Sequence, residues 1–190
     1  MASLPITPLT EAQYLEIERA AETKSEFHDG QMFAMAGGSF NHSVLTGAVG
    51  GILYRQLPPG CTLSSDMRIK VVSAGLYTYP DCGIICDEPQ FFGDRHDALL
   101  NPLLLVEVLS PSTECYDLGK KFELYRSIPS LREYLIVHQD QRRVEHYSKQ
   151  DDGSWLLRDH TGANDSVAIP RLQVTIPLGE LYANALDLAE

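Results

Sequence analysis

The sequence lacks any apolar run that approaches the roughly 20 residues of a membrane-spanning helix. Its first residues, MASLPITPLTEAQ, have neither a basic start nor an apolar signal core, so we expect no membrane contact and no secretion. Basic residues are also scarce, with 15 Lys and Arg against 26 Asp and Glu and a net charge of −11. Proteins that bind nucleic acid over a large part of their surface are usually basic. Any such contact must therefore be local, metal-assisted or supplied by a partner, and the ligand could equally be something else.

Cysteine is scarce as well, and its spacing suggests no function. The four cysteines, Cys61, Cys82, Cys86 and Cys115, form neither a CxxC pair nor a zinc framework. Two of them lie in an apolar segment that resembles a strand. We therefore expect reduced, buried thiols in a cytoplasmic protein.

The length of 190 residues is sufficient for one domain with a substantial core, and we predict a single domain over residues 1–190. Thr10 and Gln13 fit a capping box at the start of a helix that reaches about Glu22. Asp29-Gly30 is a two-residue turn signal between two strand-like runs. Further helices are predicted from about Asn41 to Gln56, from about Asp117 to Ile128, and over Leu178–Ala185. Strands are predicted at Thr62–Ser64, Met67–Val72, Tyr77–Cys86, Leu103–Leu109, Glu133–Val137, Arg143–Ser148, Trp155–Arg158 and Val174–Ile176. This order indicates an α/β (α+β) fold with a mixed sheet flanked by helices.

The strand-like run Leu103–Leu109 contains one carboxylate, Glu107, among aliphatic residues typical of a strand buried on both faces. A buried carboxylate is costly unless it is paired, hydrogen-bonded or bound to a metal. The candidates for its compensation are Asp81, which follows Tyr79-Pro80, and Lys121 on the next predicted helix.

Asp81 and Glu107 can converge at one edge of the sheet if their two segments are neighbours. Two carboxylates at such a point suit a hard cation such as Mg²⁺ or Mn²⁺. Such an ion can lower the pKa of water and neutralise the charge of a phosphate. Asp81 could instead be only a turn residue, and Glu107 only a paired core carboxylate.

Helical spacing selects between two adjacent lysines. Leu118, Lys121, Phe122 and Tyr125 follow i, i+3, i+4, i+7 and share one stripe, whereas Lys120 lies on the flank. Lys121 should therefore point toward the sheet, where an ammonium could orient water or stabilise phosphate oxygens. Alternatively, it could be a snorkelling lysine whose stem covers an aromatic ring.

Three other residues are weaker candidates. Glu26 precedes the Asp29-Gly30 turn and could add a ligand or a base, although exposed carboxylates are common in hairpins. His42, at the start of the second helix, could contact a phosphate or simply lie on the surface. Tyr125 should pack in the core with its hydroxyl available to the site.

With these residues in view, the chain resembles a bacterial family of small restriction-endonuclease-like proteins within the PD-(D/E)xK nuclease superfamily. The resemblance runs over nearly the whole chain. It is carried by the segments Lys24–Gly30, Tyr79-Pro80-Asp81, Val106–Thr113 and Glu133–Val137, by Asp117, Lys121 and Tyr125, and by His42.

The resemblance implies a restriction-endonuclease-like mixed sheet, Mg²⁺-dependent hydrolysis of phosphodiester bonds in DNA, and often a homodimer. By position, Asp81 and Glu107 correspond to the motif carboxylates and metal ligands, and Glu26 to an additional acidic residue. The usual lysine slot holds Leu109, and Lys121 supplies the lysine from the following helix, as is typical of this family. The alternatives are a non-catalytic or partner-dependent module on the same fold and an enzyme acting on a small phosphate ester.

Overall fold

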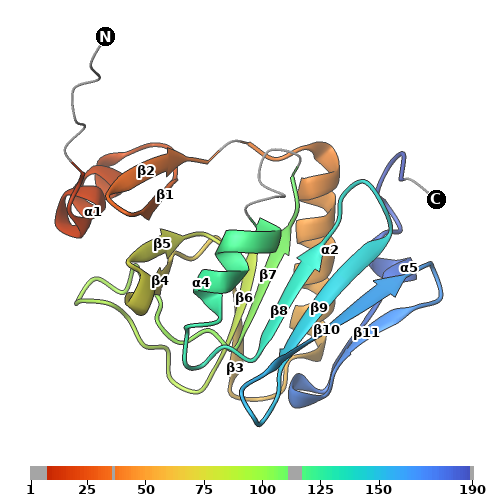
Figure 1. The fold of residues 1–190 in the computed structure, drawn as a ribbon. Helices are drawn as coiled ribbons and strands as arrows, with labels where there is room; N and C mark the ends of the chain where they lie inside the picture. Colours follow the sequence, from red (N-terminus) through yellow and green to blue (C-terminus); the bar gives the residue numbers. More distant parts are fainter. Residues whose placement is uncertain (1–7, 36, 111–116, 189–190) are drawn as a thin grey trace.

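A mixed six-stranded sheet forms the centre of the protein (Figure 1). The computed structural model describes residues 8–35, 37–110 and 117–188. The sheet order is β10-β9-β8-β7-β6-β3. These strands are β3 (Cys61–Ser65), β6 (Cys82–Cys86), β7 (Leu104–Val108), β8 (Glu133–Val137), β9 (Arg143–Lys149) and β10 (Trp155–Thr161). All neighbours pair antiparallel except β7 and β8, which are parallel.

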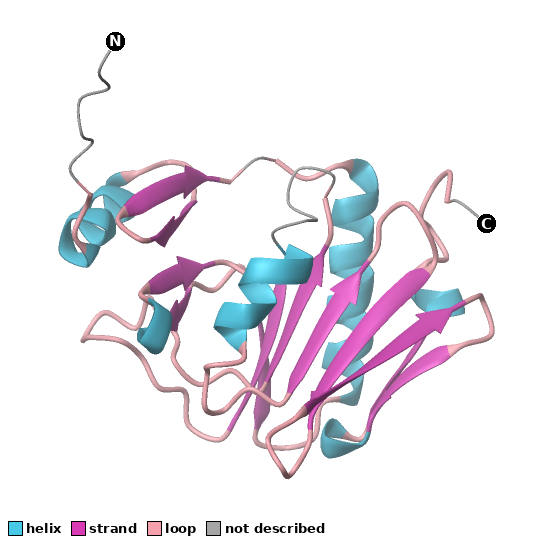
Figure 2. Ribbon diagram, in the orientation of Figure 1, coloured by secondary structure: helices cyan, strands magenta, loops and turns pink. Residues whose placement is uncertain are grey.

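The two parallel strands are the most buried part of the sheet, because helices cover both of its faces. Every residue of β7 and β8 is buried. The long helix α2 (Phe40–Gln56) packs behind the sheet, and α4 (Phe122–Tyr125) lies in front of it (Figures 1 and 2). Leu104, Val106 and Val108 belong to the core on the α2 side, whereas Leu105 and Leu109 belong to the core on the α4 side. The apolar run around Glu107 is therefore a strand buried on both faces, as predicted.

A second, four-stranded sheet lies beside the first, in the order β2-β1-β5-β4. It contains β1 (Ser25–His28), β2 (Gln31–Ala34), β4 (Ile69–Val71) and β5 (Leu76–Thr78). The predicted hairpin turn is confirmed, since Asp29 and Gly30 have φ angles of 51° and 75° between β1 and β2. The helix α1 (Glu11–Ala20) begins with the predicted capping box of Thr10 and Gln13.

The predicted continuous strand Tyr77–Cys86 is wrong. The chain leaves the small sheet after β5, passes through Tyr79-Pro80-Asp81, and enters the large sheet as β6. Proline has no N–H for a sheet ladder, so it marks the break between the two strands. This crossing places Asp81 at the junction of the two sheets.

The helix predicted from Asp117 to Ile128 is also different in detail. A π-helical turn, η2 (Asp117–Lys121), precedes the short α4, which ends before Pro129. This segment is part of the crossover that joins the parallel strands β7 and β8.

The prediction that all cysteines are reduced is wrong for Cys61 and Cys86, which form a disulfide. These residues are direct partners in the antiparallel pairing of β3 with β6, and their Cα atoms lie 4.0 Å apart. Cys82 is free and buried. Cys115 lies outside the described residues.

The C-terminal part contains the predicted hairpin β9–β10 and a two-stranded sheet of β11 (Ser166–Ile169) and β12 (Val174–Pro177). The sequence analysis missed β11, whose four residues carry only a short alternation of buried Val167 and Ile169. The last helix, α5 (Leu178–Leu181), is shorter than predicted. Within the described ranges, no helix has the length and apolarity needed to cross a bilayer. The α/β class with a mixed sheet is confirmed.

Candidate active site

Glu107 lies on the α4 side of β7 and is only 5% exposed. Its Oε1 atom accepts a hydrogen bond of 2.8 Å from the Tyr125 hydroxyl and lies 3.0 Å from the Lys121 ammonium. A carboxylate at this depth requires such partners, because burial disfavours the ionised form. The compensation expected from the sequence is therefore supplied in large part by the helix that follows β7.

Lys121 joins two acidic side chains that come from different sheets. Its Nζ atom lies 3.0 Å from Glu107 Oε1 and 3.0 Å from Glu26 Oε1. The residue is 5% exposed, whereas its neighbour Lys120 is exposed and pairs with Glu123 at 3.2 Å. The predicted choice of Lys121 as the inward-pointing lysine is therefore confirmed by its burial and its contacts.

Glu26 reaches the cluster from β1, and the sequence analysis missed the residue that holds it there. The Thr78 hydroxyl, at the end of β5, donates a hydrogen bond to Glu26 Oε1 and lies 3.3 Å from the Tyr125 hydroxyl. Thr78 is fully buried. Glu26, Lys121, Glu107, Tyr125 and Thr78 thus form a closed ring of polar contacts between the two sheets.

Asp81 immediately precedes β6. Its neighbour Cys82 pairs with Val106 of β7, so Asp81 lies near the strand that carries Glu107. Its Oδ2 atom accepts a 2.7 Å hydrogen bond from the backbone N–H of Val108, the residue after Glu107. Its Oδ1 atom lies 3.3 Å from His42 Nε2 and 3.4 Å from the Thr46 hydroxyl, both on α2. Asp81 is therefore bound to the backbone of the Glu107 strand and to His42 on α2, and the convergence of the two carboxylates on one cation stays a prediction.

Two pKa shifts describe the electrostatics around the cluster. Burial, together with the charges of Glu107 and Glu26, raises the pKa of Tyr125 well above its ordinary value. Tyr125 therefore stays protonated and acts as a hydrogen-bond donor to Glu107. Burial, with a smaller effect from the Asp81 and Glu107 charges, raises the pKa of the Cys82 thiol to about 12, so this thiol is not a nucleophile at neutral pH.

The donor chemistry of Asp81 and Glu107 fits a hard divalent cation. Mg²⁺ prefers oxygen ligands and is commonly held by one or two carboxylates together with water and substrate phosphates. In the parts of the chain that the structure describes, no group of three or more His, Cys, Asp or Glu side chains is arranged to hold a metal ion. Asp81 and Glu107 could supply two oxygen ligands to such a cation, and water and substrate would have to supply the others.

Comparison with known proteins gives a family and a fold. Residues 11–179 match the model of the Uma2 family, described as "Putative restriction endonuclease". Two relatives are uncharacterized proteins of Synechocystis sp. The first, slr1290, is 38% identical over 184 residues, which cover 95% of this chain and 94% of the relative. The second, sll1609, is 39% identical over 168 residues, which cover 87% and 95%.

One crystal structure, of a "putative nuclease belonging to DUF820" from Anabaena variabilis, has a similar fold. It superposes with a TM-score of 0.73 over 94% of this chain and 98% of that chain, at 15% sequence identity. An identity this low shows the shared fold alone.

Proposed function

Because the chain belongs to the Uma2 family, we propose that it is an endonuclease that hydrolyses phosphodiester bonds of DNA with the aid of Mg²⁺ or Mn²⁺. One observation carries the proposal. Lys121 lies 3.0 Å from the buried carboxylate of Glu107 and the half-buried carboxylate of Glu26, and Asp81 binds the backbone beside Glu107. An ammonium and several carboxylates in so small a volume suit chemistry on a phosphate group.

Asp81 and Glu107 would bind the cation. When bound, a hard divalent cation neutralises phosphate charge and makes water more acidic. Lys121 would orient the attacking water or stabilise negative charge on the phosphate oxygens. Glu26 also holds the ammonium of Lys121, at 3.0 Å, and Tyr125 fixes the orientation of Glu107 through its 2.8 Å hydrogen bond.

His42 extends the same site toward α2. Its imidazole lies 3.3 Å from Asp81 Oδ1, and its side chain is 22% exposed. A histidine at this position can hold the Asp81 carboxylate in place or donate to a phosphate oxygen, depending on its protonation state. His42 therefore belongs with the candidate site, although the sequence analysis gave it little weight.

The net charge of −11 favours one alternative, a module on the same fold that needs a partner to engage nucleic acid. An acidic surface repels a polynucleotide, so an autonomous nuclease must rely on the metal and on local contacts. The two functions differ in one observable, the intrinsic cleavage of DNA by the purified chain. The homodimer implied by the family resemblance stays a prediction, which sedimentation of the purified chain would check.

The test is a cleavage assay on supercoiled plasmid at low salt, with Mg²⁺ or Mn²⁺ and with EDTA as a blank. We expect nicking by the wild-type protein and a loss of roughly 100-fold or more in Glu107→Gln, which removes one carboxylate charge from the site. Glu123→Gln is the matched control, because Glu123 lies on the exposed side of the neighbouring helix.

Two outcomes would contradict the proposal. The first is the absence of cleavage of any DNA by the wild-type protein with either metal. The second is equal cleavage by Glu107→Gln and the wild type, which would indicate a contaminating nuclease. Cleavage of a model phosphodiester but of no polynucleotide would instead favour a small phosphate ester as substrate. Cleavage of RNA but not of DNA would identify RNA as the substrate in place of DNA.

A further inference from the structure

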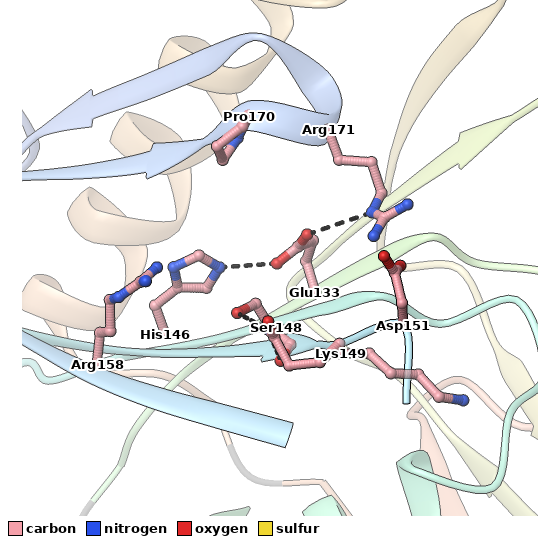
Figure 3. Close-up of a pocket in the computed structure, with 9 residues that line it drawn as sticks. Glu133, His146, Ser148, Lys149, Asp151, Arg158, Pro170 and Arg171 are labelled. Carbon is pink, nitrogen blue, oxygen red and sulfur yellow. Dashed lines mark hydrogen bonds and ion pairs between the residues drawn. The ribbon is translucent and has the colours of Figure 1, made fainter. Parts of the chain in front are cut away.

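A polar cavity lies between the large sheet and the turn that precedes β12 (Figure 3). Its volume is about 410 Å³, and its walls come from the start of β8, the end of β9 with the following turn, the first half of β10, and the 3₁₀ turn η3 (Pro170–Leu172). This volume is within the range of pockets that bind small molecules.

The cavity opens on the face of the sheet opposite to Glu107. Glu133 pairs with Leu104, and His146 pairs with Leu135, and both leucines belong to the core on the α2 side. Glu107 instead pairs with Ile136, which belongs to the core on the α4 side. A ligand in the cavity therefore cannot contact the Glu107 cluster, because the sheet separates the two sites.

The floor of the cavity is a buried, hydrogen-bonded pair of side chains. Glu133 and His146 are 4% and 2% exposed, and Glu133 Oε2 lies 2.8 Å from His146 Nε2. The other edge of the imidazole faces the Arg158 side chain, as Figure 3 shows. Such a floor offers hydrogen-bonding groups to the polar part of a ligand.

Two arginine side chains border the cavity, Arg158 from β10 and Arg171 from η3, and the exposed carboxylate of Asp151 also lines it. The ammonium of Lys149 instead lies over the Trp155 ring, which packs on the α4 side of the sheet. Arg171 Nε lies 3.8 Å from Glu133 Oε1, and its side chain is 44% exposed. Among the described residues, no carboxylate lies within ion-pair distance of Arg158. Arg158 is therefore a cation that borders the cavity without a carboxylate partner among those residues.

We propose that this cavity binds a small molecule that carries a phosphate group. Arginine forks match the geometry of phosphate oxygens. The phosphate would lie against Arg158 and Arg171, and the polar remainder of the ligand would reach the Glu133–His146 pair. The net charge of −11 favours a small ligand over a polynucleotide, because an acidic surface repels a polyanion. This inference does not depend on the nuclease activity proposed for the opposite face.

The test is calorimetric titration of the purified full-length chain at low salt with EDTA, which removes any metal-dependent binding elsewhere. The probes are inorganic phosphate, adenosine 5′-monophosphate and adenosine. We expect one molecule of the nucleotide to bind per chain and adenosine to bind at least about tenfold more weakly, because it lacks the charged group. Inorganic phosphate should compete with the nucleotide.

The variant pair Arg158→Gln with Arg171→Gln should weaken nucleotide binding by about tenfold or more. Both residues are exposed, so the fold should survive the change. Arg95→Gln, a change at an exposed arginine in a loop away from the cavity, is the matched control and should bind like the wild type.

Three results would overturn the proposal. They are the absence of binding of both phosphate and the nucleotide by the wild type, equal affinity in the wild type and the double variant, and equal affinity for the nucleotide and adenosine. Binding of a short oligonucleotide that the double variant loses, without binding of the nucleotide, would also overturn it and assign the surface to nucleic acid.

Discussion

Replacing Lys121 by methionine should destabilise the protein strongly, because it leaves the buried Glu107 and the half-buried Glu26 without their shared cation. Lys121 lies 3.0 Å from both Glu107 and Glu26, and the side chains of the three residues are 6%, 6% and 12% exposed. At an effective dielectric constant of about 20, each 3.0 Å contact has a gross attraction of about 5 to 6 kcal/mol. Desolvation cancels much of this attraction, and the loss of one partner from a buried pair costs about 3–5 kcal/mol.

Lys120→Met is the matched control, one position away on the same segment. The Lys120–Glu123 pair has side chains that are 50% and 57% exposed, so solvent screens it. Its loss should cost no more than about 0.5 kcal/mol. For a chain of this length, the two variants should differ in melting temperature by roughly 6–20 °C.

The assay is urea unfolding followed by circular dichroism, with the midpoint and the slope compared between the two variants. Adding Glu107→Gln to Lys121→Met should recover part of the loss, because it removes one of the uncompensated charges. A loss of less than about 1 kcal/mol in Lys121→Met, or an equal loss in Lys120→Met, would refute the buried ion network.

Three further predictions concern the scaffold. Reduction of the Cys61–Cys86 disulfide, whose sequence separation is 25, should lower the free energy of unfolding by roughly 3 kcal/mol; a melting temperature unchanged by dithiothreitol would contradict it. The His138 hydrogen bond holds the pKa of Glu145 below its ordinary 4.5, so Glu145 contributes stability above that pH and loses it as the pH falls through the folded-state pKa. Glu145→Gln should therefore flatten the acid dependence of the urea midpoint, and an unchanged slope would argue against this. Gly30→Ala should cost about 1–2 kcal/mol in thermal unfolding, because Gly30 has a φ of 75°.

Residues near the strand with Glu107 could be predicted because their signals are local. The aliphatic neighbours of Glu107 indicated a strand buried on both faces, and helical spacing selected Lys121 over Lys120. Both signals depend on residues within a few positions of one another. The structure bears them out through the burial of both side chains and their 3.0 Å contact.

Features that depend on pairing between distant strands could not be predicted in the same way. Thr78 is an ordinary strand residue in the sequence, and only the junction of the two sheets brings it to Glu26 and Tyr125. The disulfide between Cys61 and Cys86 likewise depends on the register of β3 against β6.

The cavity floored by Glu133 and His146 also depends on distant pairing, because β8 and β9 place these two residues side by side. Its two arginines come from β10 and η3, which are separated in the sequence by β11. No local sequence motif predicts such a site.

The central claim is that Asp81 and Glu107 form a site for a divalent cation. The most direct measurement is a calorimetric titration of Mn²⁺ at low salt into the wild-type protein and into Glu107→Ala. Our account predicts stoichiometric binding by the wild type and its loss in the variant, because Glu107 is one of the two proposed carboxylate ligands. Absence of binding by the wild type, or the same binding isotherm for both proteins, would contradict it.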